Sequence, residues 1–384
     1  MANNVTISSA VRSNLNALQS TSKLMTSVQE KLATGKKVNS ALDNPNSFFT
    51  AKGLENRAND LSSLLDDMGQ SVQTLKAADK GIEAISDLVD AAKAKANQAL
   101  QTSSQSERKK FASEYNELLT QIEDIAKDSG YKGKNLLGGT GNDLKVTFNE
   151  DGTSSLAISS VDFTDTTSST GLNLSDLASA VSNTGTLAAT NGTAGAAALT
   201  ADALITLDDD FASGDTLTLT DSTGSELGTL EIDATTTVQD VADFIGGSSS
   251  DVSATVGTGI AITSSIGITL SSDGAQSDVT VTPTTENGFS SDSKIDAVIS
   301  KLKNAQDTLR SQASTFGTNL SIVQNRQDFT NSLINTLEEG AGKLTLADTN
   351  EEGANLLALQ TQQSLASTSL SLAAQADQNV LRLF

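Results

Sequence analysis

Apolar residues near both ends of the chain recur at alternating steps of three and four, the period of an amphipathic or coiled-coil helix. Positions 11, 15, 18, 22, 25, 29 and 32 hold Val, Leu, Leu, Ser, Met, Gln and Leu. Positions 359, 363, 366, 370, 373, 377, 380 and 384 hold Leu, Gln, Ala, Leu, Ala, Asp, Val and Phe. Both terminal segments are therefore predicted to be helices. Gly35 is expected to end the first, and Asp348 or Thr349 to cap the second.

Three further helices are predicted inside this outer pair. Asn44 precedes Pro45, a residue favoured at the first position of a helix, and a helical pattern then continues to about Gln101. Some 55 residues at 1.5 Å each would span about 80 Å, a length typical of rods and coiled coils. A shorter helix is expected over 106–127. A long one is expected from Asp292 to about 339, where Gly340-Ala341-Gly342 should break it.

The middle of the chain has a different pattern, rich in Ser, Thr, Gly, Ala and Asp from about residue 160. Alternation of apolar and polar residues predicts strands, at 216–220, 230–232, 266–268 and 279–281. Apolar residues at helical spacing predict one short helix that begins at Val238 and stops at Gly246-Gly247. A hairpin is expected over 144–158, and 177–200 is expected to be a loose linker.

The order of these elements is nearly palindromic, so the first helix should pair with the last and the long helices with each other. We predict an α+β fold: a long antiparallel helical rod or coiled coil formed by both termini, with a mostly β, acidic insert at the far end. Three parts are expected. Residues 1–35 and 346–384 form a coiled coil of the terminal helices, 36–158 and 290–345 form a helical rod with the hairpin, and 159–289 form a variable β-rich domain.

Charge separates the middle of the chain from its ends. Between Lys145 and Lys294 there are 21 acidic side chains and no basic one, whereas the rest of the chain holds 26 acidic and 25 basic residues. Such an insert repels nucleic acid and anionic membranes, so neither is expected as a partner. Asp208-Asp209-Asp210 is a candidate for calcium, but it lacks an EF-hand pattern or a Gly-rich calcium repeat. No metal or cofactor is therefore expected.

Composition excludes most catalytic chemistry, because the chain has no Cys and no His. Thiol nucleophiles, Ser-His-Asp triads and HExxH zinc sites are ruled out. A hydrolase that uses only carboxylates is conceivable at 208–210, but consecutive residues of a strand point to opposite faces. We therefore expect no enzyme. The start of the chain lacks a Sec-type signal, and no run of 18 apolar residues would span a membrane.

The C-terminal segment 353–384 carries only two charges, Asp377 and Arg382. It has too few charges for a solvated helix and too little apolar bulk for a membrane helix. Burial inside one domain would explain this composition. Burial between subunits of an assembly explains it better, and ordering of the terminal segments on assembly would make polymerisation cooperative.

Four motifs, in order along the chain, resemble those of bacterial flagellin, the subunit of the flagellar filament. Residues 29–44, QEKLATGKKVNSALDN, resemble the family signature ERLSSGxRINSAxDD, and 131–139, YKGKNLLGG, resemble its (F/Y)NGxxLLxG turn. QNR at 324–326 and QNVLRLF at 378–384 are similar to the family's QNR and QNVLxLL. The resemblance covers about 1–158 and 290–384, and 205–282 resembles a β module that some flagellins carry. Asn44, the segment 45–49, Asp377 and Phe384 depart from the family pattern.

This resemblance implies a structural subunit that self-assembles into the filament, the helical propeller used for motility. The terminal helices would line an inner tube, the rods would surround it and the insert would project outward. Assembly is expected to rest on residues of the two terminal helices: Leu15, Leu18, Met25, Leu32, Leu359, Leu370, Val380, Leu381, Leu383 and Phe384. The spoke between the inner and middle layers is expected at a turn motif made of Asn39, Ser40, Asp43, Asn44 and Pro45.

The resemblance also implies partners. The chain itself is the main one, followed by the flagellar type III export apparatus, a chaperone for the C-terminal helix, and hook-associated and cap proteins. Its location would be the extracellular filament, after secretion. Some flagellins are sensed by an innate receptor through arginines that fall here at Asp90 and Ala92, so weak sensing is expected.

Two alternatives remain open, a related one and one from another class. A hook–filament junction protein shares the terminal pattern but would adapt rather than polymerise. A secreted adhesin would use the insert as a binding head, although the insert offers no aromatic platform. If the chain is the filament subunit, replacing 165–288 with a short linker should leave filaments thinner but intact.

Overall fold

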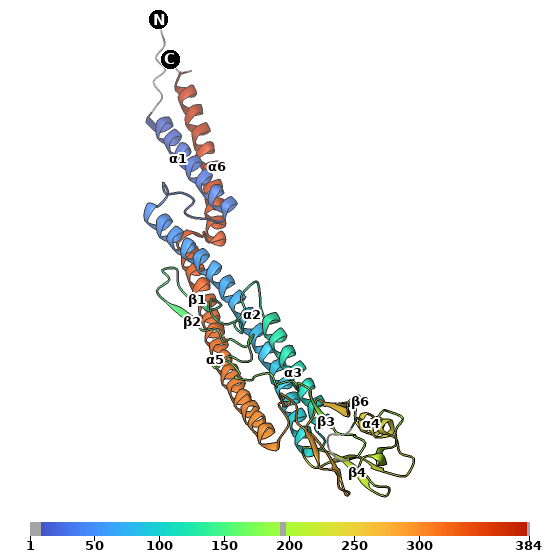
Figure 1. Cartoon of the computed structure of the whole chain (residues 1–384). Coiled ribbons are helices and arrows are strands. Elements are labelled where there is room, and N and C mark those ends of the chain that lie inside the picture. Colours follow the sequence, from blue (N-terminus) through green and yellow to red (C-terminus); the bar gives the residue numbers. More distant parts are fainter. Residues whose placement is uncertain (1–8, 193–196, 382–384) are drawn as a thin grey trace. The chain divides into compact units, whose positions relative to one another are not determined.

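The computed structural model describes residues 9–192 and 197–381. The chain forms two compact units. Unit 1 comprises Met1–Gly69, Thr147–Leu156 and Gln324–Phe384, and unit 2 comprises Gln70–Val146 and Ala157–Val323. Two long helices, α2 (Pro45–Gln101) and α5 (Asp292–Thr345), contribute residues to both (Figure 1). The predicted fold class is confirmed: long helices lie at both ends of the chain, with a β-rich insert between them.

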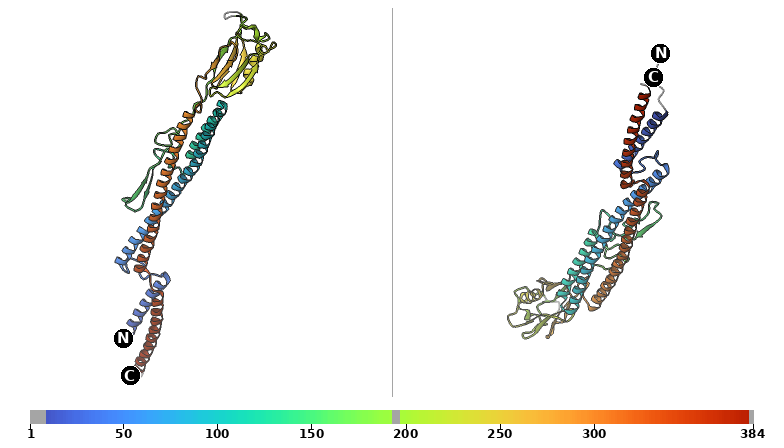
Figure 2. Two further views of the ribbon diagram at one scale, coloured as in Figure 1. Left: turned by 90° about the horizontal axis from the view of Figure 1, so that it is seen from below. Right: turned by 180° about the vertical axis from the view of Figure 1, so that it is seen from behind.

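In unit 1 the first and last helices pair as predicted. Helix α1 (Ser9–Thr34) lies antiparallel beside α6 (Thr349–Leu381), and the two remain side by side in every view (Figures 1 and 2). Asn14 meets Ser369 near one end of the pair, and Lys31 meets Glu352 near the other. Asp348 caps α6, since its Oδ1 accepts hydrogen bonds from the backbone N–H groups of Asn350 and Glu351.

The inward stripe of α1 differs from the predicted one. Thr21 and Val28 are its buried positions, 3% and 7% exposed, whereas Leu15 of the predicted stripe is 38% exposed. The stripe therefore passes through 14, 21 and 28 instead of 15, 22 and 29. Thr21 can be buried because its hydroxyl donates to the backbone oxygen of Ala17 at 2.9 Å. A purely apolar pattern search overlooks such a residue.

Helix α5 also corrects a prediction, because it runs unbroken through Gly340-Ala341-Gly342 to Thr345. Ala341 is buried at this point. A Cβ added at Gly340 would lie 3.4 Å from Cδ1 of Leu54 on α2. Small residues here let α5 pack closely on α2 within unit 1. Such packing outweighs the cost of a glycine in a helix, about 1 kcal/mol.

In unit 2 the helices carry buried apolar residues. Helix α3 (Gln105–Asp128) contributes the buried residues Tyr115, Leu119 and Ile122, and the ring of Tyr115 meets Phe289 edge-on at 5.8 Å. The segment that follows the hairpin β1 (Leu144–Thr147) and β2 (Ser155–Ile158) packs into the same unit. Its buried residues are Phe163, Leu172 and Leu174.

The insert has its own core between two antiparallel sheets. One sheet has the order β3-β7-β6 and the other β5-β4-β8-β9. The strands are β3 (Asn183–Leu187), β4 (Thr216–Asp221), β5 (Glu226–Glu231), β6 (Val252–Val256), β7 (Ile260–Ser264), β8 (Ile268–Ser272) and β9 (Val279–Val281). The 3-10 turn η1 (Ile205–Leu207) and helix α4 (Val238–Gly247) complete it, and Thr237 with Asp240 forms a capping box on α4.

Sequence reasoning missed β3, β6 and β7. Residues 177–200 were expected to be a loose linker, but this prediction was wrong for their described part. Strand β3 pairs with β7, and Leu187, Ala189 and Leu199 are buried in the core of the insert. The segment resembles a linker in composition because it contributes mostly Thr, Gly and Ala. Neighbouring strands contribute the large apolar side chains of the core, in particular Ile260 and Ile262 of β7.

The two chain segments that enter and leave the insert lie against each other. Val181 forms an antiparallel bridge with Thr285, with hydrogen bonds of 2.9 Å from Val181 N–H to the Thr285 oxygen and from Thr284 N–H to the Val181 oxygen. Just before this bridge, the Asn116 side chain of α3 holds both backbone groups of Leu177, at 2.8 and 2.9 Å. Residues up to 177 thus pack with the helices, and the sandwich begins after them.

This boundary predicts where the insert can be excised. Replacing 182–284 with a short Gly-rich turn should leave the helices of unit 2 folded, because Val181 and Thr285 are already paired. Replacing 165–288 should lower the free energy of unfolding by several kcal/mol, because it removes the buried Leu172 and Leu174, and a buried leucine is worth about 2–5 kcal/mol. Circular dichroism melts of the two variants would compare them. Equal melting would contradict the boundary.

Candidate subunit interface

Exposed apolar side chains are concentrated in unit 1. Among the described residues, nine of the 14 exposed large hydrophobic side chains belong to it, although it is the smaller unit. They are Leu15, Leu24, Leu42, Phe49, Phe329, Leu346, Leu357, Leu365 and Leu372. An isolated exposed leucine is ordinary, so exposed apolar side chains that share one face of a helix are the candidates for an interaction surface.

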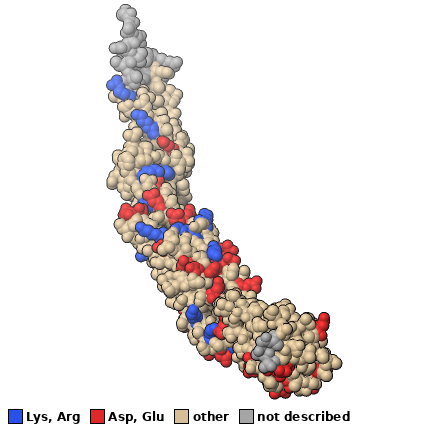
Figure 3. All heavy atoms as spheres, in the orientation of Figure 1, with Lys and Arg blue, Asp and Glu red and all other residues tan. Residues whose placement is uncertain are grey.

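The paired terminal helices carry the largest share of this apolar surface. On α6, Leu357, Leu365 and Leu372 are 63–67% exposed and recur at roughly two-turn spacing, one residue away from the stripe that faces α1. Leu24 of α1 is 57% exposed. Few charged atoms appear on the part of the pair seen in Figure 3. The helix pair therefore buries one stripe of each helix and leaves a second leucine stripe in water. Burying that second stripe would be favourable by about 1.5–3 kcal/mol per leucine.

The structure brings together most of the residues predicted for assembly. Leu18, Met25 and Leu32 of α1 are half-buried, as are Leu359 and Leu370 of α6. Leu15 is exposed on α1. Val380 and Leu381 belong to α6, but their side chains, and the whole of Leu383 and Phe384, lie outside the described residues. The role of these ten residues in assembly stays a prediction.

Sequence reasoning missed the exposed leucines of this surface, Leu24, Leu357, Leu365 and Leu372. A signal was present, because each stands off the heptad stripe of a helix that has few charges to solvate its outer face. A search for one apolar stripe assigns such residues to no face. A search for a second stripe would have found them.

Polar contacts fix the register of the two helices. Lys31 Nζ donates to Glu352 Oε1 at 2.9 Å, with side-chain exposures of 31% and 12%. Asn14 Nδ2 donates to Ser369 Oγ at 3.3 Å. Where α1 ends, Gly35 adopts a left-handed φ of +69°, and its oxygen accepts from the Ala347 N–H at 2.9 Å. The start of α6 is thereby tied to the end of α1.

The turn motif that follows α1 is a network of hydrogen bonds around one carboxylate. Asp43 Oδ2 accepts from the backbone N–H groups of Asn39 and Ser40, both at 2.9 Å, and from the Ser40 hydroxyl at 3.2 Å. These backbone donors, Ser40 before Asn39, lower the pKa of Asp43 below its usual value. Asn44 caps α2 by accepting from the Ser47 N–H at 3.1 Å, and Pro45 is the first helical residue.

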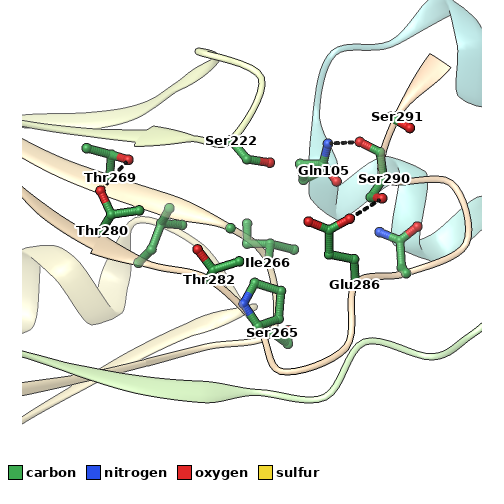
Figure 4. Close-up of a pocket in the computed structure, with 14 residues that line it drawn as sticks. Gln105, Ser222, Ser265, Ile266, Thr269, Thr280, Thr282, Glu286, Ser290 and Ser291 are labelled. Atoms are coloured by element: carbon green, nitrogen blue, oxygen red, sulfur yellow. Dashed lines mark hydrogen bonds between the residues drawn. The ribbon is translucent and has the colours of Figure 1, made fainter. Parts of the chain in front are cut away.

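Unit 2 holds a polar pocket of about 310 Å³ between the insert and the start of α3 (Figure 4). Seven of its 14 lining residues are Ser or Thr, and its one carboxylate, Glu286, is held by Ser290 Oγ at 3.0 Å and Lys294 Nζ at 2.9 Å. Gln105 closes one side by donating to the Ser290 oxygen at 2.9 Å. These contacts of Glu286 join the segment that leaves the insert to the first turn of α5.

The Asp208-Asp209-Asp210 run has a structural role in the insert. Asp208 is buried and accepts from the backbone N–H groups of Thr190 at 2.5 Å and Asp210 at 3.0 Å. No cluster of three or more His, Cys, Asp or Glu side chains in the described part of the chain could hold a metal ion. None of the helices described there has the length and hydropathy that a membrane span requires.

The Asp43 network predicts a pH-dependent turn. Because the folded pKa is lowered, the carboxylate stabilises the turn at pH values above its unfolded pKa, about 3.9, and this contribution is lost as the pH falls through the folded pKa. Asp43→Asn should therefore speed amide exchange of Asn39 and Ser40 at pH 7. The difference from the parent chain should vanish at strongly acidic pH. Exchange rates that are equal at pH 7 would contradict it.

The Lys31–Glu352 pair predicts a charge-reversal rescue. Lys31→Glu or Glu352→Lys alone places like charges at one end of the helix pair and should destabilise it by about 1 kcal/mol or less, because the site is partly exposed. The double variant should restore the melting temperature of α1 and α6, measured by circular dichroism in low salt. Arg310, paired with Asp307 within α5 at 3.3 Å, offers a matched control reversal. Failure of the double variant to recover would argue against this register.

Two family models match the chain at its two ends. The bacterial flagellin N-terminal helical region matches residues 3–142, and the bacterial flagellin C-terminal helical region matches residues 292–384. A solved structure of the flagellar junction protein FlgL from Legionella pneumophila covers 88% of this chain and 98% of its own, at 13% identity and a TM-score of 0.26.

Similar proteins bear flagellin names. Flagellin A of Rhizobium meliloti is 27% identical over 396 residues, 96% of each chain. Flagellin B of Rhizobium meliloti is 43% identical over 90 residues, 23% of each chain, and flagellin FljO of Caulobacter vibrioides is 29% identical over 151 residues, 39% of this chain and 55% of that protein. Together the two family models span more than half of the sequence, including all of α1, α2, α3, α5 and α6. The chain belongs to the bacterial flagellin family.

Proposed function

We infer that this chain is a structural subunit that self-assembles into the bacterial flagellar filament, the helical propeller for motility. One observation carries the inference: the α1–α6 pair, which belongs to the flagellin terminal regions, leaves Leu24, Leu357, Leu365 and Leu372 exposed. A homopolymer buries such a surface in every copy. When the contacts between copies are head-to-tail and do not close into a ring, they produce a helical filament.

The layered arrangement expected from the sequence is part of this proposal. Residues 1–35 and 346–384 would form the inner layer, 36–158 and 290–345 the layer of rods around it, and 159–289 the outer part. The acidic insert supports an outward position, because inserts with no basic residue repel one another and are poor candidates for close contact between copies. On the face in Figure 3 the insert shows red atoms without blue ones.

Partners beyond the chain itself follow from the family. Filaments of this family meet hook-associated proteins, and we propose that the ends of this filament do so, and that cap proteins also bind there. Export through the flagellar type III apparatus, protection of α6 by a chaperone and secretion to the cell exterior complete the proposal. The exposed outer stripe of α6, with Leu357, Leu365 and Leu372, supports a chaperone that covers this helix before assembly.

We propose no enzymatic activity. The family is one of structural proteins, and the chain lacks Cys and His. Weak sensing by an innate receptor also stays a prediction. At the positions concerned, Ala92 is fully buried and the carboxylate of Asp90 accepts a hydrogen bond from Gln306 on α5.

Seeded polymerisation followed by electron microscopy tests the function. The full chain should form filaments, and a chain truncated after Glu352 should form none, because it lacks nearly all of α6. Val380→Asp and Leu383→Asp should act in the same direction. Filaments from the truncated chain would show that α6 is not required for assembly.

A matched pair of substitutions separates assembly from folding. Leu365→Asp and Leu207→Asp both place a carboxylate at an exposed leucine, 67% exposed on α6 and 47% exposed in the insert. Both chains should fold with parental melting temperatures. Only Leu365→Asp should abolish filaments, because an unpaired charge would be buried between subunits. Filaments from Leu365→Asp at parental concentrations would contradict the proposed surface.

A further inference from the structure

Leu42 is the most exposed large apolar side chain in the described part of the chain, at 95%. It lies in the turn between α1 and α2. Leu42 N–H donates to the Ser40 hydroxyl at 3.3 Å, and Asp43 N–H donates to the Ser40 oxygen at 3.2 Å. With the three hydrogen bonds that Asp43 Oδ2 accepts, the backbone on both sides of Leu42 is held in place.

A second large apolar group stands close by in the sequence. Phe49, in the second turn of α2, is 65% exposed, and its ring meets that of Phe48 edge-on at 5.5 Å. Both Leu42 and Phe49 are therefore displayed by ordered backbone, one by the turn and the other by a helix. A backbone that is already ordered loses little further conformational entropy when its side chains bind, so apolar groups that it displays can bind at a lower entropic cost.

We propose that Leu42, together with Phe49, is an apolar anchor that inserts into a second copy of this chain in the filament. The inference rests on the proposed function and adds a contact outside the terminal helices. One observation and one property of homopolymers select a second copy as the occupant. The turn is continuous with the α1–α6 pair, because Lys36 forms an antiparallel bridge with Leu346, and Lys37 and Val38 N–H donate to the Thr345 oxygen. In a helical homopolymer, every copy also offers the same receiving surface to this turn.

The absence of Cys from the chain allows a direct test. Leu42→Cys and Leu207→Cys place single thiols at exposed leucines, the second serving as the matched control in the insert. Maleimide labelling should be fast for both thiols in the monomer. In filaments, labelling at position 42 should slow at least tenfold, whereas labelling at position 207 should not change.

Each outcome of the labelling decides the inference. Slow labelling of position 42 already in the monomer would mean that the chain itself covers Leu42, and it would overturn the inference. Equal rates at position 42 in monomers and intact filaments would also overturn it, while leaving the proposed function standing. If the parent chain forms no filaments at all, both the proposed function and this inference fail.

Substitution gives a second measurement. Leu42→Ser should raise the concentration needed for seeded growth roughly ten- to a hundredfold, the loss expected from one buried leucine. Leu42→Met, of similar volume, should stay within a few-fold of the parent chain. Monomer melting should be unchanged in both, because the side chain is in water. Parental growth by Leu42→Ser would overturn the inference.

Discussion

Two helices packed against each other can bury only one stripe of each, and this geometric limit governs the ends of the chain. In the α1–α6 pair the buried stripes are used up by the contact between the two helices, while leucines at 357, 365 and 372 lie in water. This outer face has few charged residues to interact with water, and the pair of helices alone cannot cover it. Other copies of the chain can bury it, which couples the stability of these helices to assembly.

The insert differs from the terminal helices, because its apolar core is buried within one chain. Two sheets and α4 bury a shared set of apolar residues, and buried carboxylates accept hydrogen bonds from nearby backbone and hydroxyl groups. Asp221, for example, is 3% exposed and accepts from Thr223 N–H at 2.9 Å, Ser225 N–H at 3.0 Å and the Thr223 hydroxyl at 2.6 Å. Hydrogen bonds of this kind stabilise a carboxylate without a basic partner. An entirely acidic domain can therefore fold stably.

The sequence predicted the helices well because their signals are local. Pro45 after Asn44, Asp348 before α6 and the steps of three and four in α6 all depend on residues within a turn or two. The failures involved contacts that are distant in sequence. Helix α5 continues through Gly340 because Leu54 approaches it, and β3 exists because β7 pairs with it some 75 residues later. Buried Thr21 was missed because its polarity hides the hydrogen bond that makes its burial possible.

The difference between local signals and distant contacts also explains which interface residues the sequence predicted. The inward residues of α6 follow a period that the sequence displays, whereas Leu42 belongs to no period. Its exposure depends on how Asp43 organises the turn, and only the three-dimensional arrangement of Asn39, Ser40 and Asp43 reveals it. The family signature identified this turn by its residues but did not indicate that it displays an apolar side chain.

The attachment of the insert has two parts, a single bridge between its two connecting segments and a set of polar contacts with α3. The chain enters and leaves through one bridge, Val181 with Thr285, so insertions of any size can close there with little strain. Polar contacts with α3 then restrain the orientation of the insert. Asp221 Oδ2 accepts from Gln105 N–H at the start of α3 at 3.1 Å, and Asp251 accepts from Lys109 Nζ at 2.5 Å and Ser106 Oγ at 2.6 Å. A carboxylate at a helix N-terminus is favoured by the unpaired N–H groups there. Lys109 and the polar groups at the start of α3 thus hold two carboxylates of the acidic insert and restrain its orientation on α3.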